Sequence, residues 1–134
     1  MKRITLIIIA ALALLFAGCD QKETETEMEN TYQQISPQEA KTIMDTESDY
    51  IIIDARTEEE FAAGHIPGAI LIPEYEIADR AESELPDKDA LILVYCRSGR
   101  RSKIASEELV KLGYTNVKEF GGIIDWPYEV TTEE

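Results

Sequence analysis

The feature that most constrains the fold of this chain is a regular alternation of strand-like and helix-like segments. Three runs rich in Ile, Leu and Val, at residues 50–54, 69–72 and 90–95, have the continuous apolar character of strands buried on both faces of a sheet. Segments with helix-start signals and helical periodicity separate these runs. Because strands that alternate with helices form βαβ units, we predict an α/β fold with a mainly parallel sheet flanked by helices.

Local signals set the bounds of the helices and of the remaining strands. Ser36 and Glu39 match a capping box, and Gly64 is typical of a helix end. The helices that we predict cover residues 37–44, 57–63, 75–85 and 101–112. Two further strands are predicted at a short apolar start at residues 35–36 and at residues 117–120, and the glycines at 121–122 are predicted to form a turn.

The N-terminal segment has the pattern of an export signal. Lys2 and Arg3 precede an apolar run at residues 4–16. This run is shorter than the roughly 20 residues that span a bilayer core. We therefore predict that residues 1–18 are a removable signal peptide. The alternative is an uncleaved N-terminal anchor, which the small residues just before Cys19 disfavour.

Residues 15–19 resemble the lipobox of bacterial lipoproteins, with Phe16 where that motif usually has an aliphatic residue. The resemblance implies that Cys19 is lipidated, becomes the first mature residue and anchors the chain to a membrane. Residues 19–31 would then be the lipidated Cys and a flexible acidic tether, and residues 32–134 the folded domain. We expect this domain in the cell envelope on the extracytoplasmic side, which is the periplasm in a Gram-negative bacterium.

The charge of the chain limits its partners. There are 13 Lys and Arg side chains against 27 Asp and Glu, which gives a formal net charge of −14. Such a surface repels phosphate backbones, so nucleic-acid binding is not expected. A small anionic substrate stays possible, because a local basic pocket can override the overall field. The sequence does not indicate an oligomeric state.

The residues with the strongest chemical potential follow the strand at 90–95. If Cys19 is lipidated, Cys96 is a lone thiol and is potentially reactive. The loop after it, from Arg97 to Lys103, opens a helix, and its backbone N–H groups can form an anion-binding nest. Gly99 permits a tight wrap. The basic side chains of this loop should favour the nucleophilic thiolate form of Cys96.

The same segment has a simpler interpretation, in which a solvated basic helix start covers a structural Cys. Cations at a helix N-terminus oppose the helix dipole, so this arrangement calls for an anion to compensate them. We therefore favour a site for an anionic ligand. No group of Cys, His and Asp has metal-ligand spacing, so we expect no metal and no other cofactor.

Four pieces of the chain, in order, resemble the rhodanese-like sulfurtransferases. They are Asp54-Ala55-Arg56 with Glu60-Phe61, then residues 64–69 (GHIPGA), then residues 96–102 (CRSGRRS), and finally Gly121-Gly122-Ile123 with Trp126. The resemblance implies a single domain with a five-stranded parallel sheet. It also implies transfer of a sulfane sulfur from a donor such as thiosulfate to a thiol or cyanide.

In this reading Cys96 is the nucleophile and carries the sulfur as a persulfide. The small anionic donor would be bound by Arg97, Ser98, Gly99, Arg100, Arg101 and Ser102. Two other functions are weighed against this one. The first is a binding or regulatory module, in which the thiol is a redox or persulfide sensor that reacts once without turnover. The second is a phosphatase, which loop length disfavours, because related phosphatases place Arg after five intervening residues and here four separate Cys96 from Arg101.

The supporting residues have structural explanations. We expect His65 to be a hydrogen-bonding residue rather than a base, and Asp54 to organise a loop. Arg56 and Glu60, four positions apart, are expected to form a local ion pair. Trp126 and Tyr128 are expected to pack the C-terminal tail over the domain, with the rim of a pocket as the alternative.

Overall fold

The computed structural model describes residues 31–134. The predicted signal peptide, the lipid site at Cys19 and all but the last residue of the tether therefore lie outside the described residues. Within the described part, no helix is long and apolar enough to cross a membrane.

One sheet of five strands organises the described residues, and every pairing in it is parallel. The strand order is β1-β5-β4-β2-β3, so β4 lies in the middle of the sheet. This confirms the α/β fold with a parallel sheet. The strands are β1 (Gln33–Gln34), β2 (Ile51–Asp54), β3 (Ala69–Leu71), β4 (Ile92–Cys96) and β5 (Val117–Gly122).

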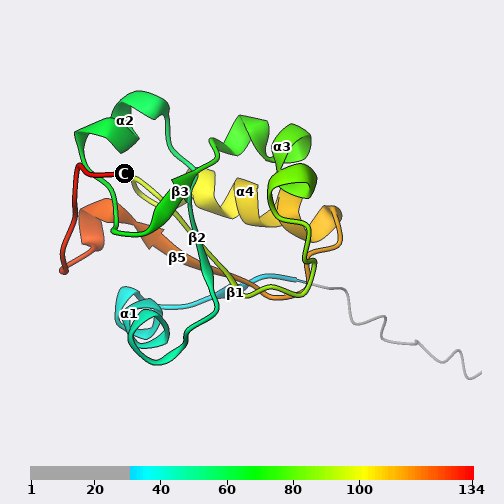
Figure 1. Ribbon diagram of the computed structural model, residues 1–134, viewed down its shortest axis with the longest axis horizontal. Helices are drawn as coiled ribbons and strands as arrows, with labels where there is room; N and C mark the ends of the chain where they lie inside the picture. The colour runs from blue at the N-terminus through cyan, green and yellow to red at the C-terminus, as the bar shows by residue number, and fades with distance from the viewer. Residues whose placement is uncertain (1–30) are drawn as a thin grey trace, which may run out of the picture.

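In the described part of the chain, four α-helices and two short 3₁₀ helices accompany these strands, and the second 3₁₀ helix follows the last strand (Figure 1). Ser36 and Thr57 each cap a helix in a complete capping box, with Glu39 and Glu60 as the reciprocal partners. The helices are α1 (Pro37–Thr46), α2 (Glu58–Ala63), α3 (Ile77–Glu84) and α4 (Arg100–Lys111), with 3₁₀ turns η1 (Glu74–Glu76) and η2 (Ile123–Asp125).

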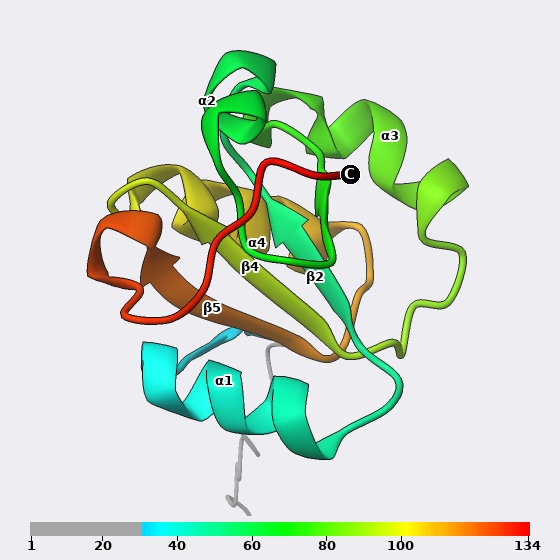
Figure 2. The same ribbon diagram turned by 60° about the vertical axis from the view of Figure 1, so that its left-hand side comes forward.

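Helices cover both faces of the sheet, which explains why its strands are apolar on both sides. On one face, Ile53 and Val94 pack with Ala81 of α3 and Leu109 of α4. On the other face, the core combines α1, the sheet and the C-terminal segment, and it contains Ala40, Ile52, Leu93, Phe120 and Trp126. Figure 2 shows α1 and α4 on opposite sides of the strands. Trp126 therefore packs the C-terminal segment onto the domain, as expected.

Three local predictions need correction. The first strand lies at residues 33–34, just before the predicted start. The segment predicted as one helix over 75–85 begins as the 3₁₀ turn η1 and continues as α3. The predicted turn at Gly121-Gly122 is wrong, because β5 continues through both glycines. The pairing of β4 with β5 shifts register there, and Cys96 pairs with Gly122.

Candidate functional site

The candidate site is the loop that joins the central strand β4 to α4. We call residues 96–101 the cysteine loop. Cys96 ends β4, as predicted, and α4 begins at Arg100. Gly99 has a φ of 109°, a left-handed conformation that favours glycine. This wrap brings the Gly99 N–H to 3.0 Å from Cys96 Sγ, to which it donates a hydrogen bond. The sulfur therefore lies against the N-terminus of α4.

The cysteine loop packs directly on the backbone of Gly122. A Cβ atom at this position would lie 1.9 Å from the carbonyl oxygen of Arg97 and 2.6 Å from Ser98 Cα. The Arg97 carbonyl also accepts a hydrogen bond of 3.2 Å from the N–H of Ile124 in η2. Gly122 thus permits the close approach that holds the loop in place.

The thiol of Cys96 is buried, with 1% of the residue exposed. It lies 3.4 Å from Ser102 Oγ, to which the S–H donates. Ser102 is itself fully buried and lies 2.7 Å from the carboxylate of Glu119 on β5. Of the residues predicted to bind the donor, Ser102 is thus beneath the loop rather than at its rim. Sequence reasoning missed Glu119, whose only signal is an acid in an otherwise strand-like segment.

The basic residues of the site divide into two groups. Arg97, Arg100 and Lys103 are exposed, and none of them forms an ion pair with another described residue. Arg101 instead forms a two-point ion pair with Glu60 of α2, with N–O distances of 2.7 and 3.0 Å. The hydrogen bond from Arg101 holds the pKa of Glu60 well below its usual value, at about 2. Arg97 and Arg100 are therefore free to meet an anion, whereas Arg101 anchors the loop.

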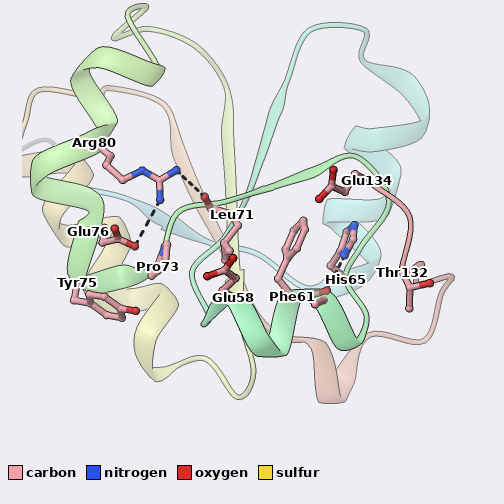
Figure 3. Close-up of a pocket in the computed structure, with 11 residues that line it drawn as sticks. Glu58, Phe61, His65, Leu71, Pro73, Tyr75, Glu76, Arg80, Thr132 and Glu134 are labelled. Carbon is pink, nitrogen blue, oxygen red and sulfur yellow. Dashed lines mark hydrogen bonds and ion pairs between the residues drawn. The ribbon is translucent and has the colours of Figure 1, made fainter.

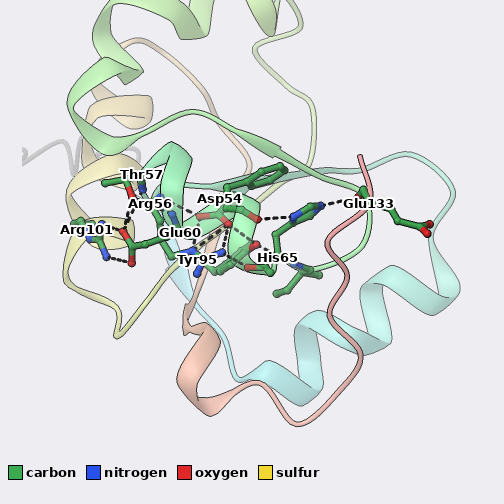
Figure 4. Close-up of polar contacts among 11 residues, drawn as sticks. Asp54, Arg56, Thr57, Glu60, His65, Tyr95, Arg101 and Glu133 are labelled. Carbon is green, nitrogen blue, oxygen red and sulfur yellow. Dashed lines mark hydrogen bonds and ion pairs between the residues drawn. The ribbon is translucent and has the colours of Figure 1, made fainter.

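The expected ion pair between Arg56 and Glu60 is wrong. Arg56 turns toward the sheet and binds Asp54 through its Nε and Nη2 atoms, at distances from 2.7 to 3.1 Å (Figure 4). Both side chains are buried, so the pair belongs to the interior rather than to the surface of α2. The competing partner Arg101 explains the difference, since it occupies both oxygens of Glu60.

Asp54 organises the neighbouring loops, as expected. Its Oδ1 accepts the backbone N–H of Arg56 at 3.0 Å, and its Oδ2 accepts the hydroxyl of Tyr95 at 2.6 Å. The same hydroxyl accepts the backbone N–H of Ile66 at 3.0 Å. Burial, together with the negative charge of Asp54, raises the pKa of Tyr95. The network joins β2, β4 and the 64–69 segment just below the cysteine loop.

His65 has the structural role that we expected. It is buried and stacks on the ring of Phe61, with the ring centroids 3.7 Å apart. Its Nδ1 lies 2.9 Å from the carbonyl oxygen of Phe61, and its Nε2 lies 3.0 Å from that of Glu133. The backbones of His65 and Thr131 are also bridged. His65 thus fastens the C-terminal tail to α2 and does not contact Cys96.

A separate cavity of about 570 Å³ is lined by residues of α2, α3 and the C-terminal end of the chain. Figure 3 shows that Phe61, Leu71, Tyr75 and Arg80 line it, and no residue of the cysteine loop does. Its other charged lining side chains are three glutamates, which do not suit an anionic ligand. Within residues 31–134, no group of His, Cys, Asp and Glu side chains is arranged to hold a metal ion.

Known proteins match the chain in family and in fold. The family model described as "Rhodanese-like domain" matches residues 36–127. The chain is 42% identical over 73 residues to the thiosulfate sulfurtransferase PspE of Escherichia coli, covering 54% of this chain and 70% of that protein. It is 43% identical over 88 residues to a sulfurtransferase of Allochromatium vinosum, covering 65% and 79%. It spans only 24% of the adenylyltransferase and sulfurtransferase UBA4 of Candida albicans, with 35% identity over 106 residues.

Solved structures show the same fold. A structure described as a rhodanese with anions from E. coli has a TM-score of 0.59 and 37% identity, and the match covers 63% of this chain and 99% of that one. A thiosulfate sulfurtransferase from Pseudomonas aeruginosa has a TM-score of 0.69 and 26% identity, and the match covers 77% of this chain and 21% of that one.

Proposed function

This chain belongs to the rhodanese-like domain family, and we propose that it is a sulfurtransferase that carries a sulfane sulfur on Cys96. The observation that carries the proposal is the position of the Cys96 sulfur at the start of α4, 3.0 Å from the Gly99 N–H, beneath a rim of exposed basic side chains. Relatives named thiosulfate sulfurtransferase support a donor of the thiosulfate class.

The residues of the cysteine loop suit an anionic sulfur donor. Arg97 and Arg100 are exposed and form no ion pair within residues 31–134, and the first turn of α4 offers backbone N–H groups. The chain as a whole is strongly acidic, so these groups form a local basic patch. This patch can therefore attract an anion to the cysteine loop.

The reaction has two steps. After Cys96 loses its proton to solvent, the thiolate attacks the outer sulfur of thiosulfate. A new S–S bond forms, the S–S bond of the donor breaks, and sulfite leaves with the electron pair. In the second step, cyanide or a thiolate attacks the outer sulfur of the persulfide, and Cys96 leaves as a thiolate. No metal or redox cofactor is required.

We further propose that the domain acts outside the cytoplasm and is anchored to a membrane by lipid on Cys19. This proposal rests on the signal-like residues 1–18 and on the lipobox-like residues 15–19. If it is right, the chain expressed in its host partitions into the detergent phase, and the Cys19→Ser variant does not. Equal partitioning of the two chains would contradict the anchor.

Turnover tests the enzymatic proposal against a sensor. With thiosulfate as the donor and cyanide as the acceptor, a catalyst releases many sulfite molecules per chain, and the Cys96→Ser variant releases none. Cys19→Ser is the matched control and should retain the rate. Release that stops after one sulfite per chain would favour a sensor that reacts once. No release, with the protein folded, would contradict both.

A further inference from the structure

Glu119 is a buried acid with no cationic partner among residues 31–134. It lies on β5, and 3% of the residue is exposed. Among the described residues, no Lys, Arg or His side chain forms an ion pair with it. Its Oε1 accepts the backbone N–H of Gly121 at 2.8 Å and the hydroxyl of Ser102 at 2.7 Å. Burying a carboxylate without a cation costs free energy. Through Ser102, which also contacts Cys96 Sγ, this negative charge lies near the thiol.

The other hydrogen bonds of Ser102 determine whether its hydroxyl donates to Cys96 Sγ or accepts from it. A serine hydroxyl has one hydrogen to donate and two lone pairs that accept. Three oxygens compete for that hydrogen: Glu119 Oε1 at 2.7 Å, the Gly99 carbonyl at 3.0 Å and the Gly121 carbonyl at 3.3 Å. The carboxylate is the nearest, and its charge makes it the strongest acceptor. Ser102 therefore points its hydrogen at Glu119 and offers Cys96 only a lone pair.

We propose that Glu119, acting through Ser102, holds the unloaded Cys96 as a thiol. The S–H donates to Ser102 Oγ at 3.4 Å, and loss of this proton would leave a negative sulfur facing a lone pair and, behind it, a carboxylate. Glu119 is thus a positioning residue for the nucleophile proposed above. Because thiols oxidise more slowly than thiolates, an idle enzyme gains protection.

Other charged groups around the thiol act in both directions. The Gly99 N–H donates to Sγ, and the positive charge of Arg101 is electrostatically coupled to Cys96, and both favour the thiolate. Glu60 of α2 and Asp54 of β2 offset part of the Arg101 charge. Three further titratable groups lie near Glu119. Tyr32 has a raised pKa, first because of burial and then because of the charges of Glu107 and Glu119. Lys103 and Asp125 line a small cavity together with Glu119. The negative charge of Glu119 thus counteracts the effect of the positive charges of the cysteine loop on Cys96.

The test is the pH profile of Cys96 alkylation in the full chain, with no sulfur donor present. The rate of iodoacetamide labelling follows the thiolate fraction. Labelling is measured on the tryptic peptide of residues 89–97, which excludes Cys19. Glu119→Gln keeps the shape of the side chain and removes its charge. We expect the midpoint of the profile to fall by about one pH unit, with roughly tenfold faster labelling near neutral pH.

Two further variants keep the test decisive. Glu107→Gln removes an exposed carboxylate on α4 and should leave the midpoint unchanged. Ser102→Ala removes the acceptor of the S–H and should also lower the midpoint. If the Ser102 hydroxyl instead donates to the thiolate, Ser102→Ala raises the midpoint, and that result overturns the proposal. An unchanged or raised midpoint in folded Glu119→Gln does the same.

The inference rests on the proposed function only in the choice of Cys96 as the nucleophile. Alkylation needs no sulfur donor, so the two failures are distinguishable. A chain that transfers no sulfur but shows the expected midpoints contradicts the sulfurtransferase proposal alone. A chain that transfers sulfur with an unchanged midpoint in Glu119→Gln contradicts the role of Glu119 alone.

Discussion

Glu60 and Arg101, 41 positions apart in the chain, form a two-point ion pair that ties α2 to the cysteine loop. The carboxylate is further held by the backbone N–H and the hydroxyl of Thr57, which cap the same helix. Arg101 is thereby fixed in direction beside Cys96. The last residue of the cysteine loop is thus positioned by a helix that is distant from it in the sequence.

Glu60→Gln should therefore weaken both the fold and the loop. The pKa of Glu60 is about 2 in the folded chain, against a usual value of 4.5. A folded-state pKa that is depressed gives stability that is fully present above pH 4.5 and is lost as the pH falls through 2. The pair is partly exposed to solvent, which screens it, so we expect a loss of about 1 kcal/mol near neutral pH.

Urea unfolding at several pH values checks this prediction. The difference in unfolding free energy between the wild type and Glu60→Gln should be constant above pH 5 and should shrink toward pH 2. Glu84→Gln, which breaks an exposed pair with Arg80, is the control and should change stability little. A difference between wild type and Glu60→Gln that grows on acidification would show that the sign is wrong.

Gly122→Ala should displace the cysteine loop. The added methyl group would overlap the carbonyl of Arg97 and approach Ser98 Cα. These are backbone atoms, which cannot rotate away as a side chain could. We expect a loss of about 2–3 kcal/mol in stability, because such overpacking forces the backbone to move. Sulfur transfer should fall more than tenfold even under conditions where the variant is folded.

Gly68→Ala is the matched control for this substitution. Gly68 has a φ of 85°, and a Cβ atom there would meet no atom within 4 Å. It should lose about 1 kcal/mol through backbone strain and should retain the transfer rate. Equal losses of rate in the two variants would show that the close contact at Gly122 is not what holds the loop.

The exposed arginines should act through charge on the donor. We expect Arg97→Ala and Arg100→Ala each to raise the KM for thiosulfate about three- to tenfold, with a smaller change in kcat. Added salt should raise the KM of the wild type, because it screens exposed charges. Lys111→Ala removes an exposed charge from the last turn of α4 and should leave the KM unchanged. A KM insensitive to both arginines would mean that the donor enters elsewhere.

Tyr95→Phe tests the buried network below the loop. The substitution leaves the Ile66 N–H without its acceptor and removes one donor to Asp54. We expect a loss of about 2 kcal/mol in unfolding free energy, measured in urea, because both groups are buried. Tyr75→Phe, at an exposed hydroxyl, should change stability by less than about 0.5 kcal/mol. A Tyr95→Phe chain as stable as the wild type would mean that the network contributes little to stability.

The central strands and helices of this fold could be predicted because short stretches of sequence determine them. The β-branched run at residues 51–53 has no polar face, which predicts a doubly covered strand, and the structure confirms β2. The capping box predicted at Ser36 sets the start of α1, and the helix predicted from Thr57 begins as α2 at Glu58. The same local logic placed Cys96 at the end of β4.

The contacts that shape the site were not readable in this way. The rule for residues four positions apart favoured an Arg56–Glu60 pair, but Arg56 instead binds Asp54, two positions before it. Glu60 is taken by Arg101, which only the tertiary fold brings near. Glu119 was missed because strand periodicity does not reveal an acid held by hydrogen bonds from α4 and from its own strand. Gly121 and Gly122 were predicted to form a turn because adjacent glycines are typical of turns. They remain in β5 through a register shift in its pairing with β4, which the local sequence does not reveal.

The most direct test of the account is the mass of the Cys96 peptide after the full chain is incubated with thiosulfate and digested without reductant. We predict a gain of one sulfur atom on this peptide. The gain should disappear after treatment with cyanide or dithiothreitol, and it should be absent from Cys96→Ser. If the folded chain, with its Cys96 thiol free, gains no sulfur from thiosulfate or from polysulfide, the claim that Cys96 carries a sulfane sulfur is wrong.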